Sequence, residues 1–188
     1  MSEENPSTVE ELVLQKLSAA DSTVQTGKVA ASSQADKSSV HLAGEYYVAA
    51  ELHRRGIHAT LTYGNAKSAD ILAFSLDGER FVRVEVKTSR VDKGSVLIWS
   101  GTMERFSLAK NQFWVLCVLP RLGDDKSFPE FYVFTAEEMR GEIQNRLDSY
   151  SAKRSGTGDP TKWMWSFNVT DLRASTAKND WAKISDYL

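Results

Sequence analysis

Strict alternation of apolar and polar residues runs through residues 57–63 and again through residues 80–88, and it predicts a strand in each segment. Residues 71–76 between them are apolar enough for a further strand. Asp77 and Gly78 separate the second and third of these strands. Asp-Gly is a strong signal for a two-residue hairpin of type I′, in which both central residues need a positive φ. Pairing about this turn would place Asp70 directly opposite Glu85.

Helical periodicity predicts two further elements around this hairpin. A helix is expected from Ser39 to Arg55, ended by Gly56 as the residue after the helix. Its inward stripe is expected to contain Leu42, Glu45, Val48, Ala49 and Leu52. Thr135 and Glu138 have the spacing of a capping box and predict a second helix, in which Met139, Ile143 and Leu147 recur on one face.

Short apolar segments elsewhere predict the remaining strands. Residues 113–119 form a continuous apolar run, which is typical of a strand buried on both faces. Residues 95–99 and 131–134 are shorter strand candidates, residues 103–111 are a helix candidate, and aromatic residues at period two predict a strand over residues 163–167. Together these elements predict an α/β fold with a mixed central sheet flanked by helices.

The polar stretches suggest three parts of the chain. Residues 1–38 read as a polar N-terminal extension, with one helix-like stretch over residues 8–20 and a linker-like or weakly helical stretch after it. Residues 39–149 are expected to form the core. Residues 150–188 are expected to add a strand and an apolar tail that packs on that core.

Composition excludes several classes of protein. No apolar run approaches the roughly 20 residues that span a bilayer, so no membrane segment is expected. The first residues lack the positive and apolar regions of a signal peptide. Cys117 is the one cysteine of the chain, which excludes an internal disulfide, an iron–sulfur cluster held by four cysteines and a multi-cysteine zinc site. A cytoplasmic, reducing location is the expectation.

Net charge argues against an extensive basic surface, because the formal charge of the chain is −2. The charge is unevenly distributed, however. Residues 1–20 carry four glutamates and one lysine, whereas residues 41–110 carry more basic than acidic residues. A nucleic acid would therefore be held by a local patch, with modest and salt-sensitive affinity.

The predicted hairpin brings together side chains that could form a metal site. Asp70 and Glu85 would face each other with Cβ atoms about 4.5–5.5 Å apart, where like charges destabilise a sheet unless a cation is shared. Mg²⁺ binds through carboxylate oxygens and would remove that repulsion. Lys87 lies two residues after Glu85 and points to the same face of the strand. Glu45, on the inward stripe of the helix, also needs a partner, because burial of an unpaired charge is unfavourable.

A purely structural reading of these residues stays open at this point. An aspartate at the start of a strand is often a turn cap, and Glu-Val-Lys is common on half-exposed strands. The register also fails if the loop contains an odd number of residues. His41 lies one helical turn before Glu45, and a lone histidine near a helix start is more often a cap or surface residue than a ligand.

The order of these parts resembles the PD-(D/E)xK nuclease superfamily, which includes restriction endonucleases and archaeal Holliday-junction resolvases. Residues 44–52 look like its first core helix, and residues 70–72 and 84–88 look like its two active-site strands; the resemblance covers about residues 40–140. It implies a restriction-endonuclease-like fold and a nuclease that cuts DNA to leave 5′-phosphate and 3′-hydroxyl ends.

The resemblance also implies roles for individual residues. Asp70 and Glu85 would hold a divalent ion, Mg²⁺ or Mn²⁺, with the carbonyl of Val86 as a further ligand. Glu45 would bind the ion through water or help to hold a second one. Lys87 would orient the attacking water beside the scissile phosphate. A homodimer would supply the two sites that cleavage of both strands of a duplex needs.

Departures from the family pattern keep other functions open. Residues 88–100 contain no glutamine, so the Gln-x-x-x-Tyr motif of the exonuclease branch is missing, and Ala69 stands where the family name has proline. The chain is also longer and more acidic than the resolvases. The main alternative is therefore a catalytically inactive nuclease-fold module that binds a partner. A third reading is an unrelated α/β protein with a chance Glu-x-Lys.

Overall fold

The computed structural model describes residues 33–62, 69–99, 109–153 and 163–188. The chain divides into two units, Met1–Ser33 and Gln34–Leu188, and all the described strands lie in the second. The helix-like stretch expected over residues 8–20 lies outside the described residues. So does most of the helix expected over residues 103–111; its last three residues form a turn and no helix.

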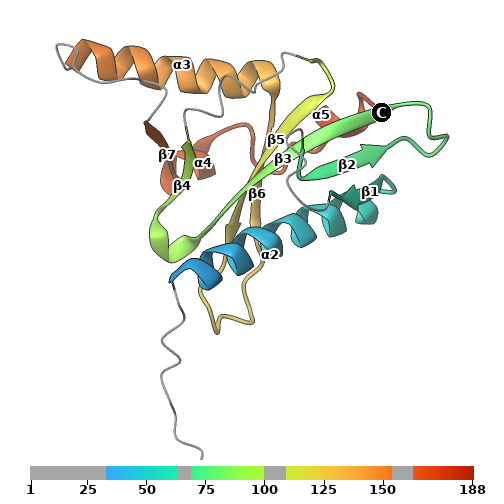
Figure 1. Ribbon diagram of the computed structural model, residues 1–188, viewed down its shortest axis with the longest axis horizontal. Helices are drawn as coiled ribbons and strands as arrows, with labels where there is room; N and C mark the ends of the chain where they lie inside the picture. Colours follow the sequence, from blue (N-terminus) through green and yellow to red (C-terminus); the bar gives the residue numbers. More distant parts are fainter. Residues whose placement is uncertain (1–32, 63–68, 100–108, 154–162) are drawn as a thin grey trace, which may run out of the picture. The chain divides into compact units, whose positions relative to one another are not determined.

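A five-stranded mixed sheet forms the centre of this unit (Figure 1). β3 pairs in parallel with β5, and the other neighbouring strands are antiparallel. In order across the sheet the strands are β1 (His58–Leu61), β2 (Ile71–Phe74), β3 (Phe81–Arg90), β5 (Gln112–Leu119) and β6 (Glu130–Thr135). A mixed central sheet flanked by helices, the predicted fold class, is thereby confirmed.

Two further strands form a separate small sheet. β4 (Ser95–Trp99) follows the short 3₁₀ turn η1 (Val91–Lys93) and pairs in antiparallel fashion with β7 (Met164–Asn168). In Figure 1 this pair lies beside α3 (Ala136–Lys153) and α4 (Val169–Ala174). The sequence predicted both strands, but it did not predict that they would pair with each other outside the central sheet.

The helix that carries Glu45, α2, spans Ser33–Arg54 and so begins earlier than the predicted Ser39. Its end is as predicted. Gly56 has φ +76°, and the amides of Gly56 and Ile57 donate to the carbonyls of His53 and Leu52 in the pattern of a Schellman motif. One prediction for its inward face is wrong, because Leu42 is 47% exposed. The helix packs instead through Gly44, Val48, Ala49 and Leu52, which turns Leu42 toward solvent.

The predicted capping box opens α3. The Thr135 hydroxyl accepts from the Glu138 amide at 3.1 Å, and the Glu138 carboxylate accepts from the Thr135 amide at 2.8 Å. Met139 and Ile143 are buried, as their spacing predicted, while Leu147 is only partly buried.

The β2–β3 hairpin has the predicted register but a different turn. Ile71 pairs with Val84 and Phe74 with Phe81. The turn is not type I′, because Gly78 has φ +76° whereas Asp77 is not among the residues with a positive φ. The Asp77 carboxylate instead accepts from the Ser75 hydroxyl and the Glu79 amide, at 2.5 and 3.1 Å. These bonds stabilise a longer loop that remains centred on the same two residues, so the pairing is unchanged.

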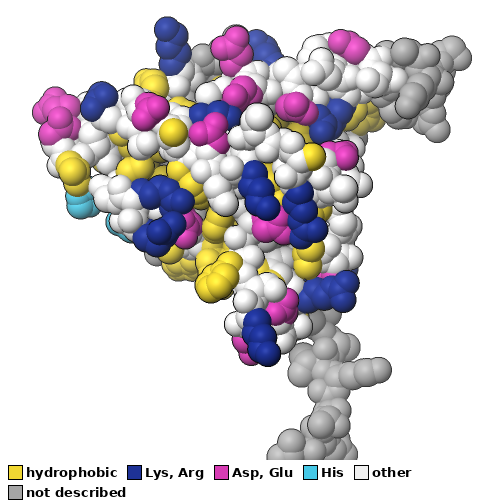
Figure 2. Space-filling view, turned by 180° about the vertical axis from the view of Figure 1, so that it is seen from behind, with side chains coloured by type: hydrophobic (Ala, Val, Ile, Leu, Met, Phe, Trp, Pro, Cys, Tyr) yellow, Lys and Arg dark blue, Asp and Glu magenta, His cyan; other side chains and the backbone are white. Residues whose placement is uncertain are grey.

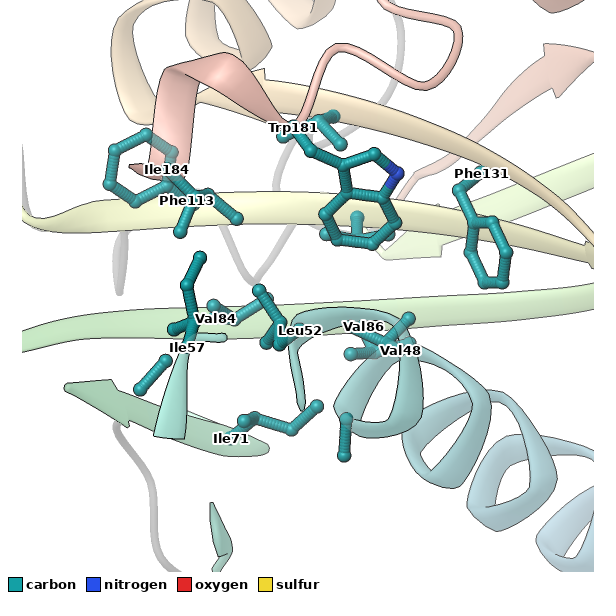
Figure 3. Packing of buried hydrophobic residues seen from close by; sticks show 14 of the residues in the cluster. Val48, Leu52, Ile57, Ile71, Val84, Val86, Phe113, Phe131, Trp181 and Ile184 are labelled. Atoms are coloured by element: carbon teal, nitrogen blue, oxygen red, sulfur yellow. The ribbon is translucent and has the colours of Figure 1, made fainter. Parts of the chain in front are cut away.

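Two apolar clusters pack on the two faces of the central sheet. β5 is buried along its whole length, as predicted, because its side chains alternate between the clusters. Figure 3 shows the first cluster, in which Val48 and Leu52 of α2 pack beside Val84 and Val86. Trp181, Ile184 and Leu188 complete this cluster around the short helix α5 (Ala182–Ser185), so the C-terminal segment is part of the core.

The second cluster joins β5 and β6 to β4, β7 and the buried side of α3. Trp165 and Phe167 of β7 belong to it, and only 7% and 1% of their surfaces are exposed. Their alternation therefore reflects packing in the core.

Candidate functional site

Asp70 is placed by backbone hydrogen bonds at the start of β2. Its amide donates to the carbonyl of Val84 at 3.0 Å. The amide of Val86 donates to Asp70 Oδ2 at 2.7 Å, so the backbone of β3 anchors the carboxylate. The register of the hairpin ends at the pair of Ile71 with Val84, so Asp70 and Glu85 are the next positions on the two strands. Direct opposition of the two acids stays a prediction.

The ammonium group of Lys87 lies among the oxygens of the same residues. Lys87 Nζ is 2.6 Å from Glu85 Oε1, 3.2 Å from the carbonyl oxygen of Val86 and 4.0 Å from Asp70 Oδ2. The side chain is 19% exposed. The two acids, one carbonyl and the lysine thus meet at one position beside β3, and that position accepts a positive charge.

Trp114 forms a wall of this position. It is the register partner of Glu85 on β5 and is 3% exposed. Lys87 Nζ lies 5.6 Å from the centroid of its indole ring, within the range of a cation–π contact. The sequence placed Trp114 in a buried strand but gave no signal that it would contact Lys87. That contact depends on parallel pairing of β3 with β5, which local periodicity does not reveal.

The helix α2 approaches the site through Gly44. A Cβ at Gly44 would overlap the side chain of Thr88, the residue after Lys87. Both residues are buried, and the close approach requires glycine at this position of α2. Because Glu45 follows Gly44, the same contact determines how closely the Glu45 carboxylate approaches β3.

Glu45 is half-buried and lies within electrostatic reach of the site. Burial raises the pKa of its carboxyl group, the negative charges of Asp70 and Glu85 raise it further, and the positive charge of Lys87 opposes both effects. Glu45 is therefore the third acid of the constellation, as its place on the predicted inward stripe suggested.

His41 lies one turn before Glu45 and is also coupled to the site. Partial burial of its ring lowers the pKa of the imidazole, and the positive charge of Lys87 lowers it further. The residue as a whole is exposed. This arrangement favours a neutral imidazole at neutral pH at the edge of the site.

The donor set fits a hard divalent cation. Two carboxylates and a backbone carbonyl are oxygen ligands of the kind that Mg²⁺ and Mn²⁺ prefer, with water and substrate completing the coordination. Within the described part of the chain, no three His, Cys, Asp or Glu side chains converge closely enough to hold an ion together. Glu45 therefore does not form a direct three-carboxylate cage with Asp70 and Glu85.

Cys117 takes no part in the site. It lies in β5 and is fully buried, as its apolar surroundings predicted, and burial raises the pKa of its thiol to about 12. A thiol in that state is a small apolar side chain and not a nucleophile.

Comparisons with known proteins give a likeness to solved structures. No family model matches the chain, and no curated protein matches it. A solved structure of Hjc, a Holliday junction resolvase from the archaeal hyperthermophile Archaeoglobus fulgidus, is similar over 79% of this chain and 97% of that chain, with 11% sequence identity and a TM-score of 0.42. A likeness at this level assigns no activity to this chain. Among the described residues, no helix combines the length and the apolar character needed to cross a bilayer.

Proposed function

We propose that the protein is a metal-dependent nuclease that hydrolyses phosphodiester bonds in DNA as an endonuclease. One observation carries the proposal: the Lys87 ammonium lies at a point reached by the carboxylates of Asp70 and Glu85 and by the carbonyl of Val86. Hydrolysis of a phosphodiester at neutral pH needs an activated water and positive charge at the phosphoryl oxygens. Acids, a carbonyl and a lysine at one position can provide for both.

Each residue has a role in this proposal. Asp70, Glu85 and the Val86 carbonyl would hold Mg²⁺ or Mn²⁺, and Glu45 would bind a water ligand of that ion. The ion would supply Lewis acidity and a more acidic water. Lys87 orients the attacking water and neutralises charge at the phosphoryl oxygen beside it. The amide of Val86 keeps the Asp70 carboxylate directed at the site.

The proposed partner is DNA, held by local contacts rather than by a broad basic surface. On the face drawn in Figure 2, Lys and Arg side chains lie next to Asp and Glu side chains. Binding should therefore be of modest affinity and weaken as the salt concentration rises. A restriction-endonuclease-like fold, a homodimer that brings two sites to a duplex and a cytoplasmic location belong to the same proposal.

The test is cleavage of supercoiled plasmid and of a four-way DNA junction by the purified protein with Mg²⁺ or Mn²⁺ and with EDTA. The informative variants are Asp70→Asn, Glu85→Gln and Lys87→Ala. Asp70→Asn retains an oxygen that can accept from the Val86 amide, so it removes the charge without removing that hydrogen bond. We expect each variant to lose about 100-fold or more of the cleavage rate while keeping the wild-type melting temperature.

Matched controls are Glu79→Gln in the exposed hairpin loop and Lys126→Ala in the exposed loop after β5, both of which should cut at the wild-type rate. Cleavage by Lys87→Ala at the wild-type rate would contradict the assigned role of the lysine. DNA binding without metal-dependent cleavage by the wild-type protein would favour the inactive nuclease-fold module instead.

A further inference from the structure

The Lys87 ammonium and a divalent ion need the same oxygens. Lys87 Nζ is already at hydrogen-bond distance from Glu85 Oε1 and from the carbonyl of Val86, at 2.6 and 3.2 Å. A metal ion bonded to these atoms would lie about 2.0–2.6 Å from them. Two positive charges do not share so small a volume, so entry of the ion requires the ammonium to leave.

Trp114 offers a place for the displaced ammonium. Its ring centroid is 5.6 Å from Lys87 Nζ, and indole is the aromatic group that attracts cations most strongly. β5 is buried on both faces, and Trp114 is 3% exposed, so the ring is held in a fixed position. The lysine has a flexible four-carbon stem and can turn from the carboxylates to the ring without movement of the backbone.

We propose that a divalent cation displaces the Lys87 ammonium from the oxygens of Glu85 and Val86, and that the ammonium then moves closer to the face of Trp114, whose ring it already contacts. Trp114 is then a positioning residue, which acts on the metal centre only through Lys87. The inference rests on the metal centre of the proposed function, and it adds a competition between the ion and a side chain of the same site.

Titration of Mn²⁺ into the full-length protein, followed by calorimetry without nucleic acid, tests this competition. Lys87→Met keeps an unbranched side chain but removes the charge, so we expect it to bind Mn²⁺ about tenfold more tightly than the wild type. Trp114→Leu removes the ring, and we expect it to bind Mn²⁺ several-fold more weakly. Lys126→Met, a change of the same kind on the exposed loop, should leave the affinity unchanged.

The double variant separates positioning from a general structural effect. If Trp114 acts through Lys87, then Trp114→Leu should have no effect on Mn²⁺ affinity once Lys87→Met is present. Should Trp114→Leu fail to fold, the same cycle is run with Trp114→Phe, because a phenyl ring attracts a cation more weakly than indole. A loss of affinity that persists in the double variant would overturn the role of Trp114.

Three outcomes distinguish this inference from the proposed function. Equal Mn²⁺ affinity of the wild type and Lys87→Met would overturn the competition alone. Failure of both proteins to bind Mn²⁺ would overturn the competition and the metal centre together. Tighter binding by Lys87→Met, with no cleavage of DNA by the wild type, would support the competition and overturn the nuclease.

Discussion

Gly44 of α2 lies against Thr88 of β3 so closely that the space holds no Cβ. This contact joins the helix that carries Glu45 to the strand that carries Glu85 and Lys87. It lies one residue from Glu45 on the helix and one residue from Lys87 on the strand. The approach of these two elements, more than any single side chain, therefore brings the third acid to the site.

Substitution of Gly44 should test that approach. We expect Gly44→Ala to lower the free energy of unfolding by about 1–3 kcal/mol, because the added methyl group forces α2 away from β3. Thr88→Ala should restore part of the loss, since it removes Oγ1 and Cγ2 but leaves Cβ close by. Urea unfolding of the single and double variants measures both effects.

Gly141 provides the matched control. It also lies in a helix, α3, but a Cβ there would meet no atom within 4 Å. Gly141→Ala should therefore raise stability by up to about 1 kcal/mol through helix propensity. If Gly44→Ala instead stabilised the protein, α2 and β3 could separate without loss of stability.

The raised pKa of Glu45 predicts a pH-dependent stability. A carboxyl group whose pKa is higher in the folded state favours folding below its unfolded pKa, and this contribution is lost as pH rises through the folded value. Glu45→Gln removes the charge, so the variant should be more stable than the wild type at pH 7, and the difference should disappear below about pH 4. Urea unfolding across pH 4–8 measures it, with exposed Glu79→Gln as the control. A destabilised Glu45→Gln at pH 7 would contradict the charge repulsion.

The ion pair of Glu130 predicts the opposite dependence. The Arg173 guanidinium, with help from the Tyr132 hydroxyl and Lys178, lowers the pKa of Glu130 to about 2. Such a group stabilises the fold above its unfolded pKa, and this stabilisation is lost as pH falls toward 2. Because Arg173 is 48% exposed, we expect Glu130→Gln to cost about 1–2 kcal/mol at pH 7 and progressively less below pH 4.

A local ion pair on α3 serves for comparison. Glu142 and Arg146 are one turn apart on one helix, and Glu142 is 43% exposed. Glu142→Gln should cost no more than about 0.5 kcal/mol, since it breaks a pair within one helix while the Arg146 guanidinium keeps its contact with the ring of Phe167. The Glu130 pair joins β6 to Arg173 of α4. Equal losses of stability for Glu130→Gln and Glu142→Gln would show that this tertiary link adds no stability.

Burial of Cys117 predicts an unreactive thiol. Its exposed fraction is 0%, and burial raises its pKa to about 12. We expect reaction with a thiol reagent at pH 8 to proceed only as fast as the protein unfolds. Rapid labelling of the folded protein would contradict the burial of β5 between β3 and β6.

Local patterns in the sequence determined much of this fold. The register of the β2–β3 hairpin followed from Asp77 and Gly78, although the turn has another geometry, because any even loop centred on that pair gives the same partners. The Schellman end of α2 followed from Gly56, and the start of α3 from Thr135 and Glu138. These features depend on residues close together in the chain, and so sequence alone specifies them.

The inward face of α2 could be read only in part from its sequence. Leu42 and Val48 are both apolar and fit one broad stripe, yet only Val48 is buried. The difference arises because Gly44 lets the helix approach β3 on one side only, a contact between residues far apart in the chain.

The sequence by itself determined the hairpin register up to Ile71 and Val84, the neighbours of Asp70 and Glu85, and the placement of Lys87 on the same face of β3 as Glu85. Only the tertiary structure decided that Trp114 would lie beside that lysine, and that Glu45 would be brought to it by the contact of Gly44 with Thr88. The physical reason is the distance along the chain over which each kind of interaction acts. Alternation and turns act over a few residues, whereas parallel strand pairing and helix-on-sheet packing depend on the shape of the whole core.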